Sequence, residues 1–225
     1  MSNTHTDELS EVLDVKNPIT YDEQVKRISE KGFIIEDSDS CKEFLKEANY
    51  YRLLAYYLPF KKKDGTYFKG IPFKRIQRIY EFDSHLRSVL SRIIEFFSMG
   101  TLSYLYTDLL TPDKKQIAST SFNTSADCLQ NWLRCLTDLR NRCAHYSKLY
   151  YWIFSAVPKT PQNAPYTFDR KRFSQILMLK YLYPNKSKWN SSVSISIEAL
   201  IDEYLPDISL KHIGFPANWK ELLKV

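Results

Sequence analysis

Three residues near the middle of the chain, Arg140, Asn141 and His145, have the side chains needed to break a phosphodiester bond without a metal ion. An arginine guanidinium binds phosphate through two parallel hydrogen bonds. A histidine moves a proton near neutral pH, and an amide can orient the imidazole or donate to phosphate. These residue types indicate acid–base chemistry on a phosphate ester. The alternative is a buried structural arginine and an ordinary surface histidine, because this spacing also arises by chance.

The segment that carries these residues has the apolar spacing of an amphipathic helix. We expect a helix over about residues 125–150, with Thr124 or Ser125 as its N-terminal cap. Its apolar residues recur at three- and four-residue intervals, as one helix face requires: Leu129, Trp132, Leu133, Leu136, Leu139, Cys143 and Tyr150.

The helical spacing also predicts where the three polar side chains point. At about 100° per residue, Asn141 and His145 share one side of the helix. Arg140 falls near the apolar stripe, where a charge is costly unless something pairs with it. Either Arg140 reaches round the helix, or a second helix or subunit completes a polar pocket there.

The sequence around the three residues resembles a family signature. Residues 139–149 read LRNRCAHYSKL, which is similar to the LRN-x-CAH-x-S-x-L segment of the Abi-like (abortive-infection) proteins of the HEPN superfamily. Other family segments are matched in order by Asn49–Leu53 with Pro59-Phe60, Ile79–Arg87, Ser98–Ser103 and Ile213–Trp219. On these segments the chain is identified as a member of the family from about residue 18 to 223.

The resemblance has one departure, in the middle of the chain. Family members usually carry several dozen more residues between the segments that begin here at Ile79 and Ser98. In this chain only Phe96 and Phe97 lie between Glu95 and the segment that begins at Ser98. The arginine expected soon after the glutamate is absent. Either the chain is a short natural variant, or a middle stretch that helps to wall the active site has been lost.

The resemblance implies a metal-independent endoribonuclease of abortive-infection or toxin type, acting in phage defence without a cofactor. The RNA 2′-hydroxyl would be the nucleophile, and the products would carry a 2′,3′-cyclic phosphate and a 5′-hydroxyl. His145 would move a proton, Arg140 would stabilise the developing phosphate charge, and Asn141 would orient the histidine. The alternative is a non-catalytic HEPN protein that binds RNA or a regulatory partner.

The resemblance also implies partners. Because the chain holds one arginine–histidine set, a composite site needs a second copy, and we expect a homodimer. RNA is the expected substrate, with tRNA as one candidate. An antitoxin protein or a regulatory RNA is a further expected partner.

The predicted fold is all-α. HEPN cores are up-and-down helical bundles, and no convincing alternating strand pattern contradicts this. We expect such a bundle with additional N- and C-terminal helices, formed by residues 18–225 as a single domain. Residues 1–17 are expected to be a flexible N-terminal arm. A helix is expected to start after Thr20, with Thr20 and Glu23 as a capping box. A turn or short hairpin is expected around Asp64-Gly65.

The net charge of +6 favours an anionic partner. Basic residues cluster between residues 61 and 78, interleaved with Tyr67, Phe68 and Phe73, which is the composition of a surface that binds phosphates and stacks bases. A solvated loop has the same composition. Together with two cations of the signature, the expected RNA-binding set is Lys61, Lys62, Lys63, Lys69, Lys74, Arg75, Arg78, Arg142 and Lys148.

Cysteine spacing and hydropathy indicate the cellular compartment of the protein. The four cysteines fit neither a disulfide framework nor a zinc site, and we expect buried thiols in a reducing cytosol. No run of 18 apolar residues and no signal-peptide core occurs. We therefore expect a cytoplasmic protein with no membrane partner and no metal site.

Overall fold

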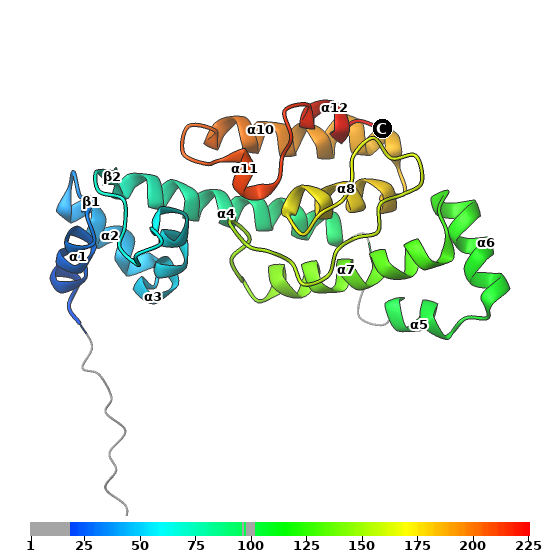
Figure 1. Cartoon of the computed structure of the whole chain (residues 1–225), viewed down its shortest axis with the longest axis horizontal. Helices are drawn as coiled ribbons and strands as arrows, with labels where there is room; N and C mark the ends of the chain where they lie inside the picture. The colour runs from blue at the N-terminus through cyan, green and yellow to red at the C-terminus, as the bar shows by residue number, and fades with distance from the viewer. Residues whose placement is uncertain (1–18, 96, 98–101) are drawn as a thin grey trace, which may run out of the picture.

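The chain folds as helices packed around one long central helix. The computed structural model describes residues 19–95, 97 and 102–225. Helix α4 (Phe73–Ile94) runs through the molecule and packs against α7 (Ala126–Ala144) and α10 (Ser194–Tyr204), and α8 (Arg172–Leu182) packs against α7 (Figure 1). The expected all-α class is confirmed.

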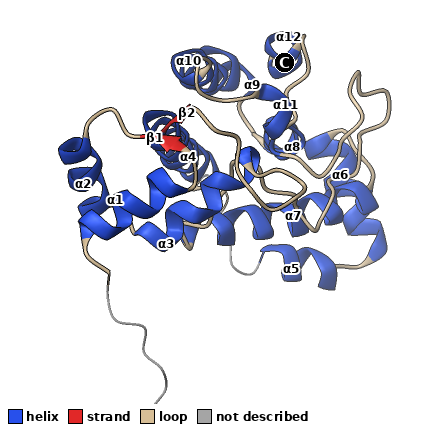
Figure 2. Cartoon of the chain, turned by 60° about the vertical axis from the view of Figure 1, so that its left-hand side comes forward, coloured by secondary structure: helices blue, strands red, loops and turns tan. Residues whose placement is uncertain are grey.

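Shorter elements extend this arrangement at both ends of α4. Residues before α4 form one end, and α5 with α6 forms the other (Figure 1). Two strands of two residues each, β1 (Phe33–Ile34) and β2 (Ile71–Pro72), pair in parallel beside the start of α4 (Figure 2). The remaining elements are α1 (Tyr21–Glu30), α2 (Ser38–Glu47), α3 (Tyr50–Leu53), the 3₁₀ turn Leu54–Phe60, α5 (Leu102–Asp108), α6 (Thr111–Phe122), α9 (Lys186–Lys188), the π-helical turn Trp189–Val193, α11 (Leu210–Ile213) and α12 (Trp219–Leu223).

The helix starts follow the local sequence. The hydroxyl of Thr20 accepts a hydrogen bond from the backbone N–H of Glu23, and the Glu23 carboxylate accepts one from the N–H of Thr20. This reciprocal pair satisfies two backbone donors that the first turn of α1 leaves unpaired. Helix α7 begins in the same way, because the hydroxyl of Ser125 accepts from the N–H of Cys128 at 3.2 Å. Both capping predictions are confirmed.

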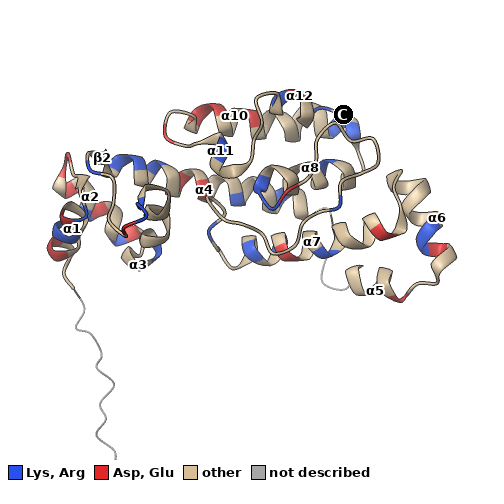
Figure 3. Cartoon of the chain, in the orientation of Figure 1, with Lys and Arg blue, Asp and Glu red and all other residues tan. Residues whose placement is uncertain are grey.

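The expected hairpin lies between the 3₁₀ turn and β2. The N–H of Lys62 donates to the carbonyl of Thr66 at 2.7 Å, and Gly65 takes a positive φ of 88° at the turn. Lys61 and Tyr67 form a bridge that closes the hairpin. Lysine and arginine are frequent along this segment and at the start of α4 (Figure 3).

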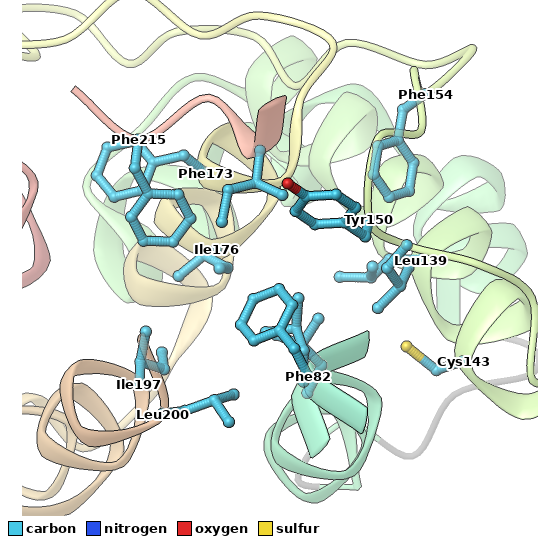
Figure 4. Packing of buried hydrophobic residues seen from close by; sticks show 14 of the residues in the cluster. Phe82, Leu139, Cys143, Tyr150, Phe154, Phe173, Ile176, Ile197, Leu200 and Phe215 are labelled. Atoms are coloured by element: carbon cyan, nitrogen blue, oxygen red, sulfur yellow. The ribbon is translucent and has the colours of Figure 1, made fainter. Parts of the chain in front are cut away.

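The core lies where α4, α7, α8 and α10 meet. Phe82 of α4 faces Leu139 of α7, Ile176 of α8 and Ile197 of α10, with Tyr150 between the helices (Figure 4). All five side chains are at most 1% exposed. Burying each large apolar side chain contributes about 1.5–3 kcal/mol. The second half of α7, which carries the signature, is therefore fixed against α4 by the core.

The four cysteines lie in the interior of the protein. Cys41, Cys128, Cys135 and Cys143 are buried and free, which confirms the prediction of buried thiols. Burial raises the pKa of Cys135 and Cys143 to about 12, so both stay protonated. Within the described residues no helix is both long and apolar enough to cross a membrane, and no group of three or more histidine, cysteine, aspartate or glutamate residues is placed to hold a metal ion.

Candidate functional site

Helix α7 ends at Ala144, before His145, so the helix predicted to reach residue 150 is too long. The N–H of Tyr146 donates to the carbonyl of Cys143 at 3.0 Å, and the N–H of Ser147 donates to that of Arg142 at 2.9 Å. These two nested hydrogen bonds are those of the Schellman motif, which ends many helices. The second half of the signature, residues 145–152, is therefore a loop, which we call the signature loop.

The three candidate catalytic residues lie at the end of α7 and are all exposed. The guanidinium of Arg140 donates to the amide oxygen of Asn141 at 3.0 Å. Arg140 is therefore not buried on the apolar stripe, and the partner expected for its charge is the adjacent amide. Leu139 and Cys143 occupy the buried side, and Arg140 lies about 100° round the helix from Leu139, at the edge of that side.

The candidate residues face different hollows. Arg140 lines one of about 340 Å³ together with Ile94 and Phe97, at the end of α4. Asn141 lines a larger groove of about 720 Å³ between α5 and α7. His145 is not among the lining residues of either. A single chain thus places the three residues at one end of α7 without enclosing them in a common cavity.

A buried carboxylate fixes the signature loop from below. Asp83 of α4 is fully buried, and its oxygens accept hydrogen bonds from the backbone N–H groups of Leu149 (2.9 Å) and Tyr150 (2.5 Å). The hydroxyl of Tyr56 donates to the same carboxylate at 2.7 Å, and the guanidinium of Arg87 pairs with it. A buried charge is tolerated where every lone pair is satisfied in this way.

Arginines from other elements hold the carbonyls of the signature loop. Arg52 of α3 donates to the carbonyl of Tyr146. The fully buried Arg172 of α8 donates to the carbonyls of Leu149 and Trp152. Because charge-assisted hydrogen bonds are stronger than neutral ones, the loop is held from two further sides.

The two signature cations expected to bind RNA point into the protein. The ammonium of Lys148 donates to the carbonyl of Ala55 at 2.8 Å. Burial lowers the pKa of Lys148 to about 8, and the positive charges of Arg172 and Arg142 add to the effect while Asp83 opposes it. Arg142 lies over the ring of Trp152 at 3.9 Å, and burial lowers its pKa as well. Both cations, which were expected to bind RNA, are thus engaged within the protein.

The basic segment between residues 61 and 78 divides into two parts. Its lysines are exposed: Lys61, Lys62, Lys63, Lys69 and Lys74. Its arginines are engaged by the C-terminal part of the chain, because Arg75 donates to the carbonyl of Asp207 at 3.0 Å and Arg78 pairs with the Asp207 carboxylate at 3.2 Å. The structure thus leaves the lysines as the exposed cations of this segment.

The interleaved aromatic residues are divided in the same way. Phe73 is buried in the core, and Tyr67 packs against Phe33 at 5.6 Å between ring centroids. Phe68 is 50% exposed, with the ammonium of Lys62 at 5.5 Å from its ring. Of the three aromatic residues, Phe68 is the one whose ring face could stack with a base.

Sequence reasoning missed the residues that position the signature loop, chiefly Asp83, Arg87 and Arg172. A signal for Asp83 was present, because it lies within the apolar stripe of the long helix, next to Phe82 and Leu86. A carboxylate on a buried face requires partners. The identity of those partners depends on contacts between distant segments, which spacing does not show.

A comparison with protein families gives a partial match. The model of a family described as Abi-like protein matches residues 43–97 and 92–151. This match supports membership of the Abi-like family. Its two parts overlap at residues 92–97. This is the place where the sequence departs from the family pattern. No curated protein and no solved structure matches the chain.

The Abi-like segments converge on one place in the structure. Arg52 belongs to the segment Asn49–Leu53, Asp83 to Ile79–Arg87 and Leu149 to the signature, and all three lie within the matched residues. Arg52 and Asp83 both bind the backbone of the signature loop. In this chain, Arg52 and Asp83 therefore hold the loop that follows His145.

Proposed function

We propose that this Abi-like protein is a metal-independent endoribonuclease of HEPN type that acts in phage defence. The main support is the hydrogen-bonded pair of Arg140 and Asn141. Both residues are exposed, and Asn141 lies one helical turn before His145. A guanidinium held by an amide remains free to bind a phosphate with its other donors.

The proposed reaction needs only acid–base help and charge stabilisation. The RNA 2′-oxygen attacks the adjacent phosphorus and loses its proton, while the 5′-oxygen leaves and gains one. His145 moves one of these protons, and Arg140 stabilises the negative charge that develops on the phosphate. The products are a 2′,3′-cyclic phosphate and a 5′-hydroxyl.

The signature loop would contribute rigidity. Catalytic groups act well when they are held close to the productive geometry before the substrate binds. Asp83 and Arg172 hold the loop within a few residues of His145 through backbone N–H and carbonyl groups. A rigid loop therefore supports the proposed proton-transfer role of His145.

We further propose that two copies form the site. Arg140 and His145 do not line a common cavity in one chain, so a second copy that places its own His145 near Arg140 would complete the set. Closed two-fold symmetry would build two equivalent sites of this kind. RNA, with tRNA as a candidate, is the proposed substrate.

The alternative is a non-catalytic protein that binds RNA or a regulatory partner, such as an antitoxin. Two observations favour it: His145 does not line the hollow that Arg140 lines, and the sequence is shorter than the family pattern near Glu95-Phe96. The two functions differ in one measurable property, which is whether RNA is cut.

The deciding experiment incubates the purified protein with tRNA and total RNA in EDTA. Cleavage by the wild type that is lost in both His145→Ala and Arg140→Ala supports the ribonuclease. Arg27→Ala, which removes an exposed arginine from the remote helix α1, should cleave normally. Product ends are checked for the cyclic phosphate. RNA binding without cleavage by any form supports the alternative.

Mixing the two inactive variants tests the two-copy site. A mixed dimer of His145→Ala and Arg140→Ala contains one complete set if the residues come from different copies. The mixture should then recover about a quarter of the wild-type rate, because half of the dimers are mixed and each has one working site. No recovery would place both residues of a site in the same chain.

A further inference from the structure

The backbone at Tyr146 has a conformation that tyrosine seldom takes. Its φ is +51°, in the left-handed region, at the position where the Schellman ending of α7 reverses the chain. Asn123 and Gly214, at the ends of α6 and α11, have φ values of 48° and 83°. Asparagine and glycine are the residues usually found there, and another L-residue costs about 1–2 kcal/mol.

The ring of Tyr146 receives no compensation from the fold. It is 68% exposed and makes no ring contact with any other described residue. Tyr151 provides a matched comparison within the same loop: its φ is also positive, at +56°, but its ring packs against His212 with centroids 4.9 Å apart. Packing thus accounts for an aromatic residue at position 151 and does not account for one at 146.

Two arginines hold the backbone around Tyr146 in place. Arg52 donates to its carbonyl, and Arg142 donates to the carbonyl of Lys148 two residues further on. A strained residue persists where neighbouring contacts over-determine it, and such residues gather at functional sites. His145 precedes Tyr146 directly in the chain.

We propose that the exposed ring of Tyr146 is a stacking platform for one base of a single-stranded RNA, next to the bond that His145 would cut. Aromatic rings bind single-stranded bases through their faces, whatever the sequence. A base within a duplex has no free face to offer. This inference rests on the proposed function, because it deepens the substrate class of the same site.

The test measures binding without cleavage. A fluorescent single-stranded oligoribonucleotide of mixed sequence, 2′-O-methylated throughout, has no 2′-hydroxyl to attack the phosphate. Its affinity is measured by anisotropy for the wild type and for variants of Tyr146. Tyr146→Phe and Tyr146→Trp should bind within about threefold of the wild type, whereas Tyr146→Asn and Tyr146→Gly should bind about tenfold or more weakly. A blunt duplex of the same sequence should not distinguish the variants.

Thermal stability separates a binding role from a structural one. Tyr146→Asn and Tyr146→Gly should raise the Tm, because both residues adopt the left-handed conformation more readily than tyrosine. Affinity and stability should thus change in opposite directions. Tyr151→Asn is the matched control, and it should leave the affinity within about twofold of the wild type.

The remaining outcomes overturn the inference. Unchanged affinity in Tyr146→Asn, an equal loss in Tyr146→Phe, or an equal loss in Tyr151→Asn would each show that the ring of Tyr146 is not the platform. Cleavage assays keep the two proposals apart. RNA cut equally well by wild type and Tyr146→Asn overturns the stacking site alone. Tyr146-dependent binding without any cleavage overturns the ribonuclease and leaves the RNA site.

Discussion

The carboxylate of Asp83 accepts a hydrogen bond of 2.9 Å from the backbone N–H of Leu149. The bond joins the middle of the central helix α4 to the signature loop, four residues after His145. Asp83 is fully buried, and Arg87 on the next turn of α4 pairs with it. An ion pair buried in the core thus holds the end of the loop that contains Leu149 and Tyr150.

Replacing Asp83 by asparagine should therefore destabilise the protein strongly. The charge of Arg87 would be left buried without its partner, and the new amide group would face backbone N–H donors. Loss of one member of a buried ion pair costs about 3–5 kcal/mol. The free energy of unfolding is measured by urea denaturation.

The control for this substitution is Asp202→Asn. Asp202 pairs with Lys220 at 2.7 Å, but both side chains are about half exposed. Such pairs contribute about 1 kcal/mol or less. A similar loss in Asp83→Asn and Asp202→Asn would show that the buried pair has no special role.

Lys148 should make stability depend on alkaline pH. Its pKa is about 8 in the folded protein, against an ordinary value near 10.5, because burial disfavours the charged ammonium. Between about pH 8 and 10.5 the unfolded chain binds the proton and the folded chain does not. Stability therefore rises with pH in this window, by up to about 1.4 kcal/mol per pH unit, and the penalty is fully present below pH 8.

This dependence is measured as a difference between the wild type and Lys148→Met. Urea denaturation at pH 7, 8, 9 and 10 should show the wild type gaining stability relative to the variant above pH 8. Other titrating groups cancel in the difference. Lys220→Met removes a half-exposed lysine and should give a constant difference up to pH 9. A constant difference for Lys148→Met would mean that its ammonium is not destabilised by burial.

The sequence predicted the features that depend on neighbours along the chain. The Thr20–Glu23 capping box and the Ser125 cap each involve residues three positions apart. The end of α7 could not be predicted in the same way, because Tyr146 stands where glycine or asparagine usually marks a helix end. The apolar spacing of α7 continues as far as Tyr150. Tyr150 is buried in the core, but it belongs to the signature loop and not to the helix.

The sequence predicted the residue types of the candidate site but not the residues that hold the signature loop in place. The types and order of Arg140, Asn141 and His145 are local, and the structure places them at one helix end. The hydrogen bonds that hold the signature loop join Asp83 to Leu149 and Arg172 to Trp152. Contacts of this kind arise from the packing of helices, which periodicity alone does not determine.

Arg172→Lys should loosen the signature loop while keeping the charge. The planar guanidinium donates to the carbonyls of Leu149 and Trp152 at once, and a single ammonium cannot reproduce that fork. We expect a loss of about 1–3 kcal/mol, because buried carbonyl groups lose a partner. The free energy of unfolding and the rate of proteolysis in residues 145–152 are measured together.

The control for Arg172→Lys is Arg170→Lys. Arg170 donates to the carbonyl of Phe154 through one nitrogen at 2.7 Å, and the residue is exposed. We expect a smaller loss of stability and unchanged proteolysis within the signature loop. Unchanged stability and proteolysis in Arg172→Lys would show that one cation of any shape suffices to hold the loop.

Asn141→Ala should lower RNA cleavage without destabilising the fold. Asn141 is exposed, and its amide oxygen is the partner of the Arg140 guanidinium at 3.0 Å. Loss of that partner frees Arg140 to move, and misplacement of a catalytic group costs about 10- to 100-fold in rate. The free energy of unfolding should change by less than about 0.5 kcal/mol.

Asn141→Asp separates positioning from charge. The carboxylate keeps an acceptor for Arg140 and binds it more strongly, so the arginine stays in place. The added negative charge also repels the RNA phosphate and competes for the guanidinium. We therefore expect weaker RNA binding and a higher KM in Asn141→Asp, whereas Asn141→Ala should lose kcat with a smaller change in KM. Normal cleavage by both variants would remove Asn141, and with it the Arg140–Asn141 pair, from the proposed site.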